Sequence, residues 1–424
     1  MSAEKTVENP AIAEGARRIV VGVAGGIAAY KACHLIRDLK ESGDDVRVIP
    51  TVSALQFVGA PTFEALSGNP VATSVFDNVD EVQHVRLGQD ADAVVIAPAT
   101  ADLIARIAAG RADDLLTATI LVATCPIIIA PAMHTEMWLN PATQDNVATL
   151  RRRGITVIEP AVGRLTGKDS GPGRLPDPAV IAETVRSALS GFSVPSDWHG
   201  KKVVISAGGT QENLDPVRFL GNRSSGRQGF ALAETARQRG AEVVLVAGNV
   251  DKTGIPDSVR VIPVVAAADM QAAMDVESAD ADVVIMAAAV ADYRPETVAQ
   301  SKLKKGADDA ALEKIALTPN PDILAGLVDK RRTGLIPSAT VIVGFAAETG
   351  DPSTSALEFA QAKFERKGCD LLMVNDVSDG KVFGRSRNQG WILSAAEKPV
   401  LIQEGTKHVV AAQILDVVNA KMAD

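Results

Sequence analysis

Small and polar residues in the second half of the chain form a loop that could bind an anion. A short apolar run, Val203 to Ile205, leads into the turn Ser206-Ala207-Gly208-Gly209-Thr210, and helical periodicity resumes only after Ser224-Ser225-Gly226. Glycines let backbone N–H groups approach an anion, and the N-terminus of the next helix adds unpaired donors. Gly221 to Gly226 has P-loop spacing, but Arg227-Gln228 replaces the usual Lys and Ser/Thr. The pattern predicts an anion-binding loop, with an ordinary strand–turn–helix connection as the alternative.

Three comparable turns occur in the first half, and each directly follows an apolar run. The turns are Gly25-Gly26, Thr51-Val52-Ser53 and Pro98-Ala99-Thr100-Ala101-Asp102. None of them carries the Gly-x-Gly-x-x-Gly fingerprint of a dinucleotide site. Their backbone and hydroxyl groups could instead hold phosphate or ribityl oxygens. In a doubly wound sheet all three would lie at the carboxyl edge, where such folds bind ligands.

The elements that must position these turns alternate between strands and helices. We expect strands at 18–24, 46–50, 91–97, 203–207, 242–247, 282–287 and 340–345, and helices at 27–40 and 177–190. The uncharged stretch Leu115 to Met133 is interrupted by Pro126 and Pro131, which favours a helix and then a buried strand over a membrane span. The fold class predicted is α/β, with two doubly wound, Rossmann-like parallel sheets.

The chain should divide near residue 195. Residues 191–200 contain Pro195 and have weak periodicity, which is typical of a linker. We therefore predict a disordered tail at 1–16, a first domain at 17–190, a linker at 191–200 and a second domain at 201–424.

Composition limits the class of protein. Of 424 residues, 46% are hydrophobic but only 4% aromatic, which fits cores of Val, Ile, Leu and Ala in buried parallel sheets. The net charge is 43 − 52 = −9, which argues against a general nucleic-acid or membrane-surface protein but allows small anionic ligands at local basic sites. Cys33, Cys125 and Cys369 are too scattered for a disulfide framework or a Cys-based zinc site, so we expect a cytoplasmic protein.

Three blocks of the first half resemble those of the flavin-dependent cysteine decarboxylases. They are Gly25 to Lys31, Pro98 to Asp102 and Pro131 to Trp138, and His84 matches the family's active-site histidine. The resemblance implies a flavodoxin-like fold and an FMN cofactor that oxidises the thiol of an N-acyl cysteine so that carbon dioxide can leave. It implies that His84 is the acid/base, whereas a lone His is otherwise more often structural. The implied FMN-binding residues are Gly25, Gly26, Ile27, Ala28, Ser53, Pro98, Ala99, Thr100 and Met133, and the implied decarboxylase substrate residues are His134 and Met137.

The chain departs from this family at two places. His134 replaces the Asn of the usual Pro-x-Met-Asn motif, and its imidazole could donate the same hydrogen bond to a carboxylate. The substrate flap, Gly163 to Arg174, lacks the cysteine thought to protonate the enethiolate. Lys168 and Asp169 are the nearby candidates for a proton donor, although a charged, glycine-rich loop is more often a mobile surface.

Blocks of the second half resemble phosphopantothenate–cysteine ligases. They include Ala207 to Thr210, Asp215 to Phe219, Asn222 to Gly226, Ala287 to Arg294, Asn320 to Leu324, Gly344 to Thr349 and Asn375 to Val377. Behind a decarboxylase, these blocks are similar to those of the bifunctional enzymes of coenzyme A biosynthesis, over roughly residues 17 to 420. Such enzymes join 4'-phosphopantothenate to cysteine through an acyl-cytidylate and then decarboxylate the product to 4'-phosphopantetheine.

This resemblance implies CTP as co-substrate and Mg²⁺ held mainly by the nucleotide phosphates. The implied CTP-binding residues are Met286, Ala287, Ala288, Asp292, Lys302, Pro321, Asp322, Ile323, Leu324, Phe345, Lys363 and Lys367, and the implied phosphopantothenate-binding residues are Gly209, Thr210, Arg218 and Asn222. Lys302 is the predicted catalytic residue of the ligase. Without the resemblance, its lysine-rich stretch would be interpreted as a solvated loop, and Lys363 and Lys367 as ordinary surface charges on one helix face.

The same resemblance implies a homo-oligomer. Family ligase sites form across a dimer and family decarboxylases form trimers, so one chain with both contacts would build a closed assembly such as a dodecamer. The alternatives are an NAD(P)-dependent reductase, a flavin prenyltransferase for the first half alone, and a flavoprotein scaffold of the phosphatase-inhibitor kind.

Overall fold

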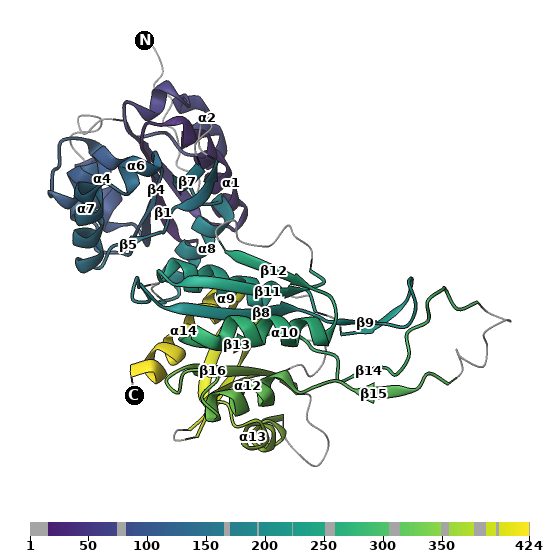
Figure 1. Cartoon of the computed structure of the whole chain (residues 1–424). Coiled ribbons are helices and arrows are strands. Elements are labelled where there is room, and N and C mark those ends of the chain that lie inside the picture. Colours follow the sequence, from purple (N-terminus) through teal and green to yellow (C-terminus); the bar gives the residue numbers. More distant parts are fainter. Residues whose placement is uncertain are drawn as a thin grey trace, which may run out of the picture. The chain divides into compact units, whose positions relative to one another are not determined.

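The chain folds into two units, Met1–Gly191 and Phe192–Asp424. The structure is a computed structural model that describes residues 16–73, 82–164, 170–192, 195–222, 224–250, 259–304, 314–348, 356–376, 387–395 and 398–423 (Figure 1). Lys168, Asp169 and nearly all of the predicted tail lie outside the described residues.

The first unit is built on a five-stranded parallel sheet with the order β2-β1-β3-β4-β5. Its strands are β1 (Arg18–Val23), β2 (Asp45–Pro50), β3 (Ala93–Ala99), β4 (Ile127–Pro131) and β5 (Thr156–Val157). This is the flavodoxin-like order, in which the chain reverses its direction of winding between β1 and β3. The predicted fold class is confirmed for this unit.

Helices cover both faces of this sheet, because its Val- and Ile-rich strands are apolar on both sides. The helices are α1 (Ala32–Glu41), α2 (Ala60–Ser67), α3 (Gln83–Gln89), α4 (Ala101–Ala108), α5 (Leu115–Val122), α6 (Thr135–Trp138), α7 (Pro141–Arg152) and α8 (Pro178–Leu189). One face packs against α1, α2 and α8, and the other against α4, α5 and α7. Leu115 to Met133 forms a helix and then a strand, as predicted, and none of the helices among the described residues is long and apolar enough to cross a membrane.

A hairpin follows β5 in the first unit. Its strands are β6 (Ala161–Arg164) and β7 (Ser170–Arg174), which pair antiparallel. The φ of Gly173 is +139°, and a Cβ on this residue would lie 2.3 Å from the carbonyl oxygen of Met133. Only glycine therefore allows β7 to approach the segment after β4 this closely. The hairpin carries the predicted substrate flap.

The second unit contains an eight-stranded sheet with the order β12-β11-β8-β13-β16-β17-β18-β19. The strands are β8 (Lys202–Gly208), β11 (Glu242–Gly248), β12 (Arg260–Val264), β13 (Val283–Met286), β16 (Val341–Glu348), β17 (Leu371–Asp376), β18 (Arg387–Ser394) and β19 (Val400–Thr406). The first six are parallel, and β18 and β19 add an antiparallel edge that the sequence analysis did not predict. Winding reverses between β8 and β13, which makes this sheet doubly wound as well.

Two groups of helices cover this second sheet. They are α9 (Arg227–Gln238) and α14 (Lys407–Ala423) on one face, and α10 (Ala267–Glu277), α12 (Ile323–Arg332) and α13 (Ala356–Lys367) on the other. A Cβ on Gly229 would lie 2.5 Å from Cβ of Ala207, so glycine is needed for α9 to pack this close to β8. Every residue of α9 from Gly229 to Gln238 is buried.

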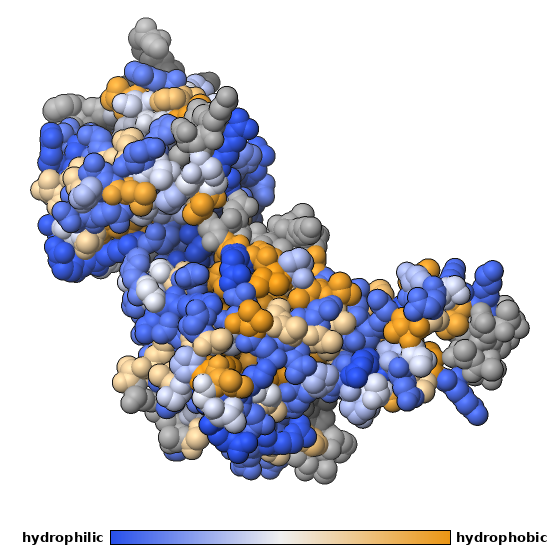
Figure 2. Space-filling view, viewed as in Figure 1, coloured by the Kyte–Doolittle hydropathy of each residue, from blue (hydrophilic) through white to orange (hydrophobic). Residues whose placement is uncertain are grey.

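Two short hairpins extend from this sheet as an arm (Figure 1). The arm comprises β9 (Gln211–Asn213) with β10 (Phe219–Gly221), and β14 (Tyr293–Pro295) with β15 (Leu317–Pro319). Apolar side chains remain exposed on it, namely Val217, Phe219, Tyr293, Val298, Ile315 and Leu317. Figure 2 shows hydrophobic areas among hydrophilic ones along the arm.

The segment predicted to be a linker contributes to the second core. Trp198 is 0% exposed and packs with the strands, α9 and α14 of that unit. Its indole N–H donates to Asn419 Oδ1 at 2.8 Å, and the Arg239 guanidinium lies 4.9 Å from the centre of its ring. Residues 195–200 therefore fold with the second unit.

Candidate functional sites

The second unit has a cavity of about 1360 Å³ at the point where its winding reverses. Its walls come from the carboxyl ends of β13, β16 and β17 and from the N-terminal turns of α9 and α12. Adjacent crossover connections run in opposite directions at such a point, which leaves a crevice above the strand ends.

One wall is the beginning of α9, which the sequence predicted as an anion site. Gly226 is the N-cap with φ +73°, and no side chain caps the helix there. Ser224, Arg227 and Gln228 line the cavity beside it. The first turn of α9 therefore presents backbone N–H groups toward the cavity, together with the positive end of the helix dipole.

Lys407, the first residue of α14, lines the same wall. Gln228 Nε2 donates to its backbone carbonyl at 3.2 Å, which links α14 to α9. Burial of the ammonium, followed by repulsion from Arg227, lowers the pKa of Lys407 to about 8.

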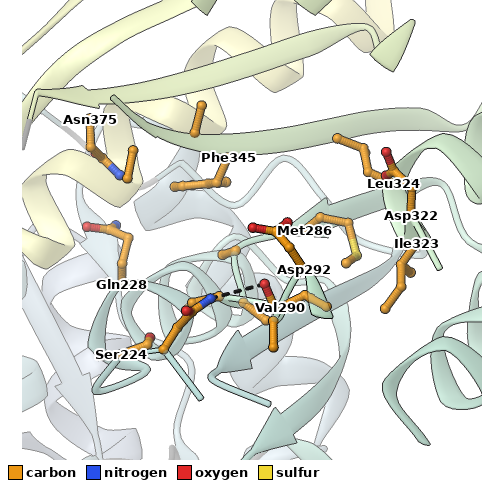
Figure 3. Close-up of a pocket in the computed structure, with 18 of the residues that line it drawn as sticks. Ser224, Gln228, Met286, Val290, Asp292, Asp322, Ile323, Leu324, Phe345 and Asn375 are labelled. Atoms are coloured by element: carbon orange, nitrogen blue, oxygen red, sulfur yellow. Dashed lines mark hydrogen bonds between the residues drawn. The ribbon is translucent and has the colours of Figure 1, made fainter. Parts of the chain in front are cut away.

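The opposite wall is the beginning of α12. Asp322 caps this helix by accepting from the Ala325 backbone N–H at 3.1 Å, and it also forms an ion pair with Lys367 of α13. Desolvation alone would raise the pKa of Asp322, but Lys367 and the Ala325 N–H together hold it below its ordinary value. Figure 3 shows Ser224 and Gln228 on the side of the cavity opposite Asp322, Ile323 and Leu324.

The loop after β13 forms the floor between these walls. Asn222 Nδ2 donates to the carbonyl of Val290 at 3.0 Å, the bond drawn in Figure 3. Behind it, the backbone of Ala291 is held on both sides, since its N–H donates to Thr210 Oγ1 and its carbonyl accepts from Asn320 Nδ2, each at 2.9 Å. These contacts fix the loop that carries Asp292 at the cavity.

The structure brings most of the predicted ligase residues together. The cavity is lined by Asn222, Met286, Ala287, Ala288, Asp292, Pro321, Asp322, Ile323, Leu324, Phe345, Lys363 and Lys367. Their individual roles remain predictions.

Four of the predicted ligase residues do not line this cavity, namely Gly209, Thr210, Arg218 and Lys302. The Thr210 hydroxyl is used in the loop contact to Ala291. Arg218 forms an ion pair with the buried Asp215 at 2.7 Å and donates to the carbonyl of Leu303 at 2.8 Å. Desolvation of Asp215 is outweighed by Arg218 and by three backbone N–H groups, so the pKa of Asp215 lies far below its ordinary value.

Lys302 lies on the arm, and its neighbour Leu303 is held at both backbone groups. The Leu303 N–H donates to Asp215 Oδ2 at 3.2 Å and its carbonyl accepts from Arg218. The Lys302 side chain itself is exposed.

The cavity is positively charged although the chain as a whole is negative. Among the described residues, five cationic side chains line it (Arg227, Lys363, Arg366, Lys367 and Lys407), against two carboxylates, Asp292 and Asp322. Apolar groups of Met286, Leu324 and Phe345 are also part of the lining. No cluster of three or more His, Cys, Asp or Glu side chains that could hold a metal occurs in the part of the chain that is described.

Sequence reasoning missed several lining residues. Gln228, Arg366, Asn375, Asn388 and Lys407 were not predicted as ligand contacts. Asn388 donates to Asn375 Oδ1 at 2.9 Å, which joins β18 to β17 beside the cavity. The block that contains Asn375 was a signal for its position, whereas nothing local marks Lys407.

In the first unit the predicted turns meet at the carboxyl edge of the sheet. A Cβ on Gly25 would lie 2.3 Å from Ser53 Cβ, so the turns after β1 and β2 touch there. The Ala24 N–H donates to the Pro98 carbonyl at 3.0 Å, and the Ala132 N–H donates to the Ala99 carbonyl at 2.9 Å. These bonds connect the ends of β1, β3 and β4. Among the described residues, no atom lies within 4 Å of a Cβ placed on Gly26, so the space there is open.

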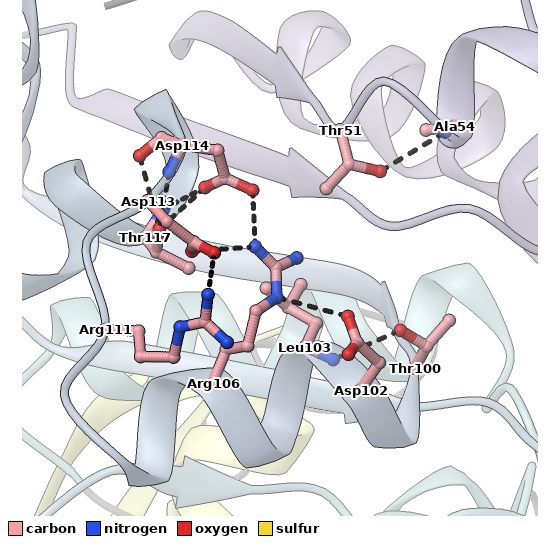
Figure 4. Close-up of polar contacts among 10 residues, drawn as sticks. All are labelled: Thr51, Ala54, Thr100, Asp102, Leu103, Arg106, Arg111, Asp113, Asp114 and Thr117. Atoms are coloured by element: carbon pink, nitrogen blue, oxygen red, sulfur yellow. Dashed lines mark hydrogen bonds and ion pairs between the residues drawn. The ribbon is translucent and has the colours of Figure 1, made fainter.

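Polar contacts fix the turn after β3 (Figure 4). Thr100 caps α4 by accepting from the Leu103 N–H at 3.3 Å. Arg106 pairs with Asp102 at 3.1 Å, Asp113 at 3.2 Å and Asp114 at 2.7 Å. Arg106 therefore holds α4 to the start of α5, and Asp102 orients Arg106 from the first turn of the same helix. Thr51 similarly accepts from the Ala54 N–H at 3.2 Å after β2.

His84 lies in the first turn of α3, immediately after the residues 74–81 that are not described. Its Nδ1 atom is buried and has no hydrogen-bond partner among the described residues. An unpaired buried nitrogen is unfavourable in a purely structural histidine, because its desolvation is not compensated. Its catalytic role remains a prediction.

His134 and Met137 lie on α6, next to the flap. His134 is the N-cap residue of α6, but its side chain makes no capping hydrogen bond and is exposed. The Met133 N–H donates to the Gly173 carbonyl at 2.9 Å, which holds β7 beside this segment. The imidazole is therefore available to a ligand at the edge of the flap.

Comparisons with known proteins agree with this division of the chain. A model of the flavoprotein family matches residues 8–190, and a model of the DNA/pantothenate metabolism flavoprotein C-terminal domain matches residues 198–422. The chain is 57% identical over 405 residues to the coenzyme A biosynthesis bifunctional protein CoaBC of Mycolicibacterium smegmatis, covering 95% of this chain and 97% of the relative. It is 41% identical over 410 residues to the protein of the same name from Vibrio vulnificus, covering 96% and 98% respectively. A solved C-terminal domain of a CoaBC protein is 32% identical, covers 54% of this chain and 99% of that chain, and has a TM-score of 0.44.

Proposed function

The chain belongs to the family of bifunctional coenzyme A biosynthesis proteins, and on this premise we propose how the residues of each unit carry out its reaction. The enzyme ligates 4'-phosphopantothenate with cysteine and decarboxylates the product to 4'-phosphopantetheine. The first unit is the decarboxylase and the second is the ligase. None of the three alternatives, a reductase, a prenyltransferase or a scaffold, accounts for both family matches.

The ligase uses CTP in this proposal. The positively charged cavity with an apolar section is the observation that carries it, because a nucleoside triphosphate combines several negative charges with a flat base. The substrate carboxylate attacks the α-phosphorus, and pyrophosphate leaves. The amine of cysteine then attacks the acyl-cytidylate, which releases CMP and forms the peptide bond. Cationic groups assist both steps by stabilising the departing phosphates.

Magnesium enters with the nucleotide. Two carboxylates line the cavity, and Asp322 is already paired with Lys367, so Asp292 is the group we assign to the metal. Mg²⁺ is commonly held by one or two carboxylates together with substrate phosphates. This donor set fits a nucleotide-borne ion better than a permanent protein site.

The arm completes the ligase site of a second copy of the chain. Lys302 and Arg218 lie on the arm, outside the cavity of their own chain, and the arm also carries exposed apolar side chains. A dimer would bury these side chains and bring Lys302 to the partner's nucleotide. Combined with trimers of the decarboxylase unit, such dimers would build the closed, dodecameric assembly.

FMN is the cofactor of the decarboxylase in this proposal. The turns after β1, β2, β3 and β4 meet at the winding reversal, where flavodoxin-like folds hold this group, and the open space at Gly26 leaves room for it. The residues proposed to hold it are those of the predicted turns, including Gly25, Ser53 and Thr100. When bound, FMN would take two electrons from the thiol and return them to the product after carbon dioxide is lost, so that the overall decarboxylation is redox-neutral.

The histidines of this unit handle protons and the carboxylate. His84 removes the thiol proton, for which its unpaired Nδ1 is suited. His134 donates a hydrogen bond to the carboxylate that leaves as carbon dioxide. The unpaired cysteines are consistent with our proposal that the enzyme works in the cytoplasm.

The ligase proposal is tested with the full chain, Mg²⁺, 4'-phosphopantothenate, cysteine and each of the four nucleoside triphosphates. Pyrophosphate, acyl-cytidylate and peptide product are followed separately. We expect CTP to be preferred, and Lys302→Gln to lower kcat by about 10²–10³. Lys314→Gln, an exposed lysine farther along the arm, is the matched control and should leave kcat unchanged.

Two outcomes would contradict this assignment. In the first, Lys302→Gln raises KM for CTP and leaves kcat unchanged. Lys302 would then contribute equally to binding of the substrate and of the transition state, and would not be catalytic. A preference for another nucleotide would overturn the proposed co-substrate while leaving the ligase activity intact.

A further inference from the structure

Lys407 occupies a position where a positive charge is unfavourable in the protein alone. It is the first residue of α14, so its ammonium lies near the positive end of that helix dipole. It lines the cavity beside Arg227 and the uncapped first turn of α9, and among the described residues it has no carboxylate partner. Two cations and two helix N-termini therefore converge on one wall, without a counter-charge from the described part of the chain.

The other basic wall of the cavity is compensated. Lys367 is paired with Asp322, and the same carboxylate caps α12. The positive charge there is thus partly neutralised before any ligand binds. The α9 wall is the one that gains most from an anion, and it lies across the cavity from Asp322 (Figure 3).

We propose that Lys407, together with Arg227 and the first turn of α9, binds the triphosphate of the nucleotide substrate in the ligase reaction. The proposal rests on the proposed use of CTP. A triphosphate carries more negative charge than the monophosphate of 4'-phosphopantothenate, so it fits the uncompensated wall better. The apolar lining that suits a base includes Leu324, which Figure 3 places on the far side from Ser224 and Gln228.

Nucleotide binding should then depend on the protonation of Lys407. Its pKa is lowered to about 8, first by burial and then by Arg227. The groups that face it are Arg227 of α9, which remains charged, and the amide of Gln228, which does not titrate. The ammonium form binds phosphate, so KM for CTP should rise as pH passes above about 8. An arginine at this position would stay charged over that range.

The test uses Lys407→Gln, Lys407→Arg and the control Lys398→Gln in the full chain. Lys398 is exposed and does not line the cavity, and Gln and Arg have helix propensities close to that of Lys. KM is measured for CTP and for 4'-phosphopantothenate from pH 7 to pH 9.5, and CTP binding is measured by calorimetry without the second substrate. The thermal unfolding transition of the ligase unit, followed by calorimetry in the same samples, shows whether this unit remains folded.

We expect Lys407→Gln to raise KM and Kd for CTP by roughly 10- to 100-fold, the value of a hydrogen bond to a charged group. Lys407→Arg should retain binding at pH 7 and lose the rise of KM above pH 8. A larger effect on KM for 4'-phosphopantothenate than on KM for CTP would overturn the assignment to the nucleotide. Unchanged constants for both substrates would remove Lys407 from the site, even if the wild-type enzyme uses CTP as proposed.

Discussion

Replacement of Trp198 by alanine tests where the ligase unit begins. The side chain is fully buried among β-strands and helices of that unit, although it lies only seven residues after the division at Gly191. Its loss also removes the ring beneath Arg239 and the donor to Asn419. Arg239 would keep its ion pairs with Asp197 and Asp416, each at 2.6 Å.

The expected cost is large. Truncation of a buried Trp to Ala lowers the free energy of unfolding by about 3–5 kcal/mol, because the transfer free energy is lost and a cavity remains. For a unit of this size, each kcal/mol corresponds to roughly 2–4 °C in Tm. The ligase transition of Trp198→Ala should therefore fall by about 6–20 °C. Trp198→Phe keeps a ring against Arg239 and loses mainly the bond to Asn419, so we expect a decrease of about 2–6 °C.

The assay separates the two units within one full-length sample. Calorimetry, loss of ligase activity and release of flavin are followed during the same temperature ramp. The decarboxylase has its own cores, so its transition should not move. A decrease of less than about 3 °C in Trp198→Ala would refute the reasoning. So would a shift confined to flavin release, since Trp198 would then stabilise the first unit.

Two other substitutions test single groups. His84→Asn should abolish carbon dioxide release, because the acid/base is lost. Flavin binding and ligase activity should be retained, because the turns that hold the flavin are not disturbed. The control is His34→Asn, on the exposed surface of α1. Wild-type decarboxylation by His84→Asn would show that another group moves the proton. Asp322→Ala should lower the free energy of unfolding of the ligase unit by about 1 kcal/mol more than Asp322→Asn, because Asn retains the N-cap of α12 and both lose the ion pair with Lys367. Chemical denaturation measures the difference, and equal destabilisation would show that the cap contributes little.

The sequence predicted the parts of the fold that depend on local pattern. Buried strands such as 203–207 and 242–247 are marked by β-branched runs, and they appear as β8 and β11 with bounds one residue different or less at each end. Their order in the sheet placed the glycine turns at one edge, and the cavity lies there. Residues in contiguous blocks, such as Pro321 to Leu324, line it together for the same reason.

Tertiary contacts explain what local pattern did not predict. The resemblance implied that Thr210 and Arg218 bind phosphopantothenate. Local pattern did not show that their side chains also bond to Ala291 and Asp215. Lys407 is separated from Arg227 by 180 residues, and only packing of α14 on α9 brings the two charges together. Pro195 and the glycines near it favoured a linker at 191–200. The aromatic side chain of Trp198 was the one signal that this segment contributes to a core.

The close packing of α9 on β8 affects the thermodynamics of nucleotide binding. Because Gly229 leaves no room for a Cβ beside Ala207 and α9 is buried from Gly229 to Gln238, the backbone of this wall loses its conformational freedom when the ligase unit folds. Ligand binding does not have to order it again, so the entropy opposing association comes mainly from the ligand and from exposed side chains such as Arg227. The wall with the greatest uncompensated charge is thus also preorganised. Its electrostatic attraction for the nucleotide therefore contributes to affinity with little free energy lost in ordering the protein.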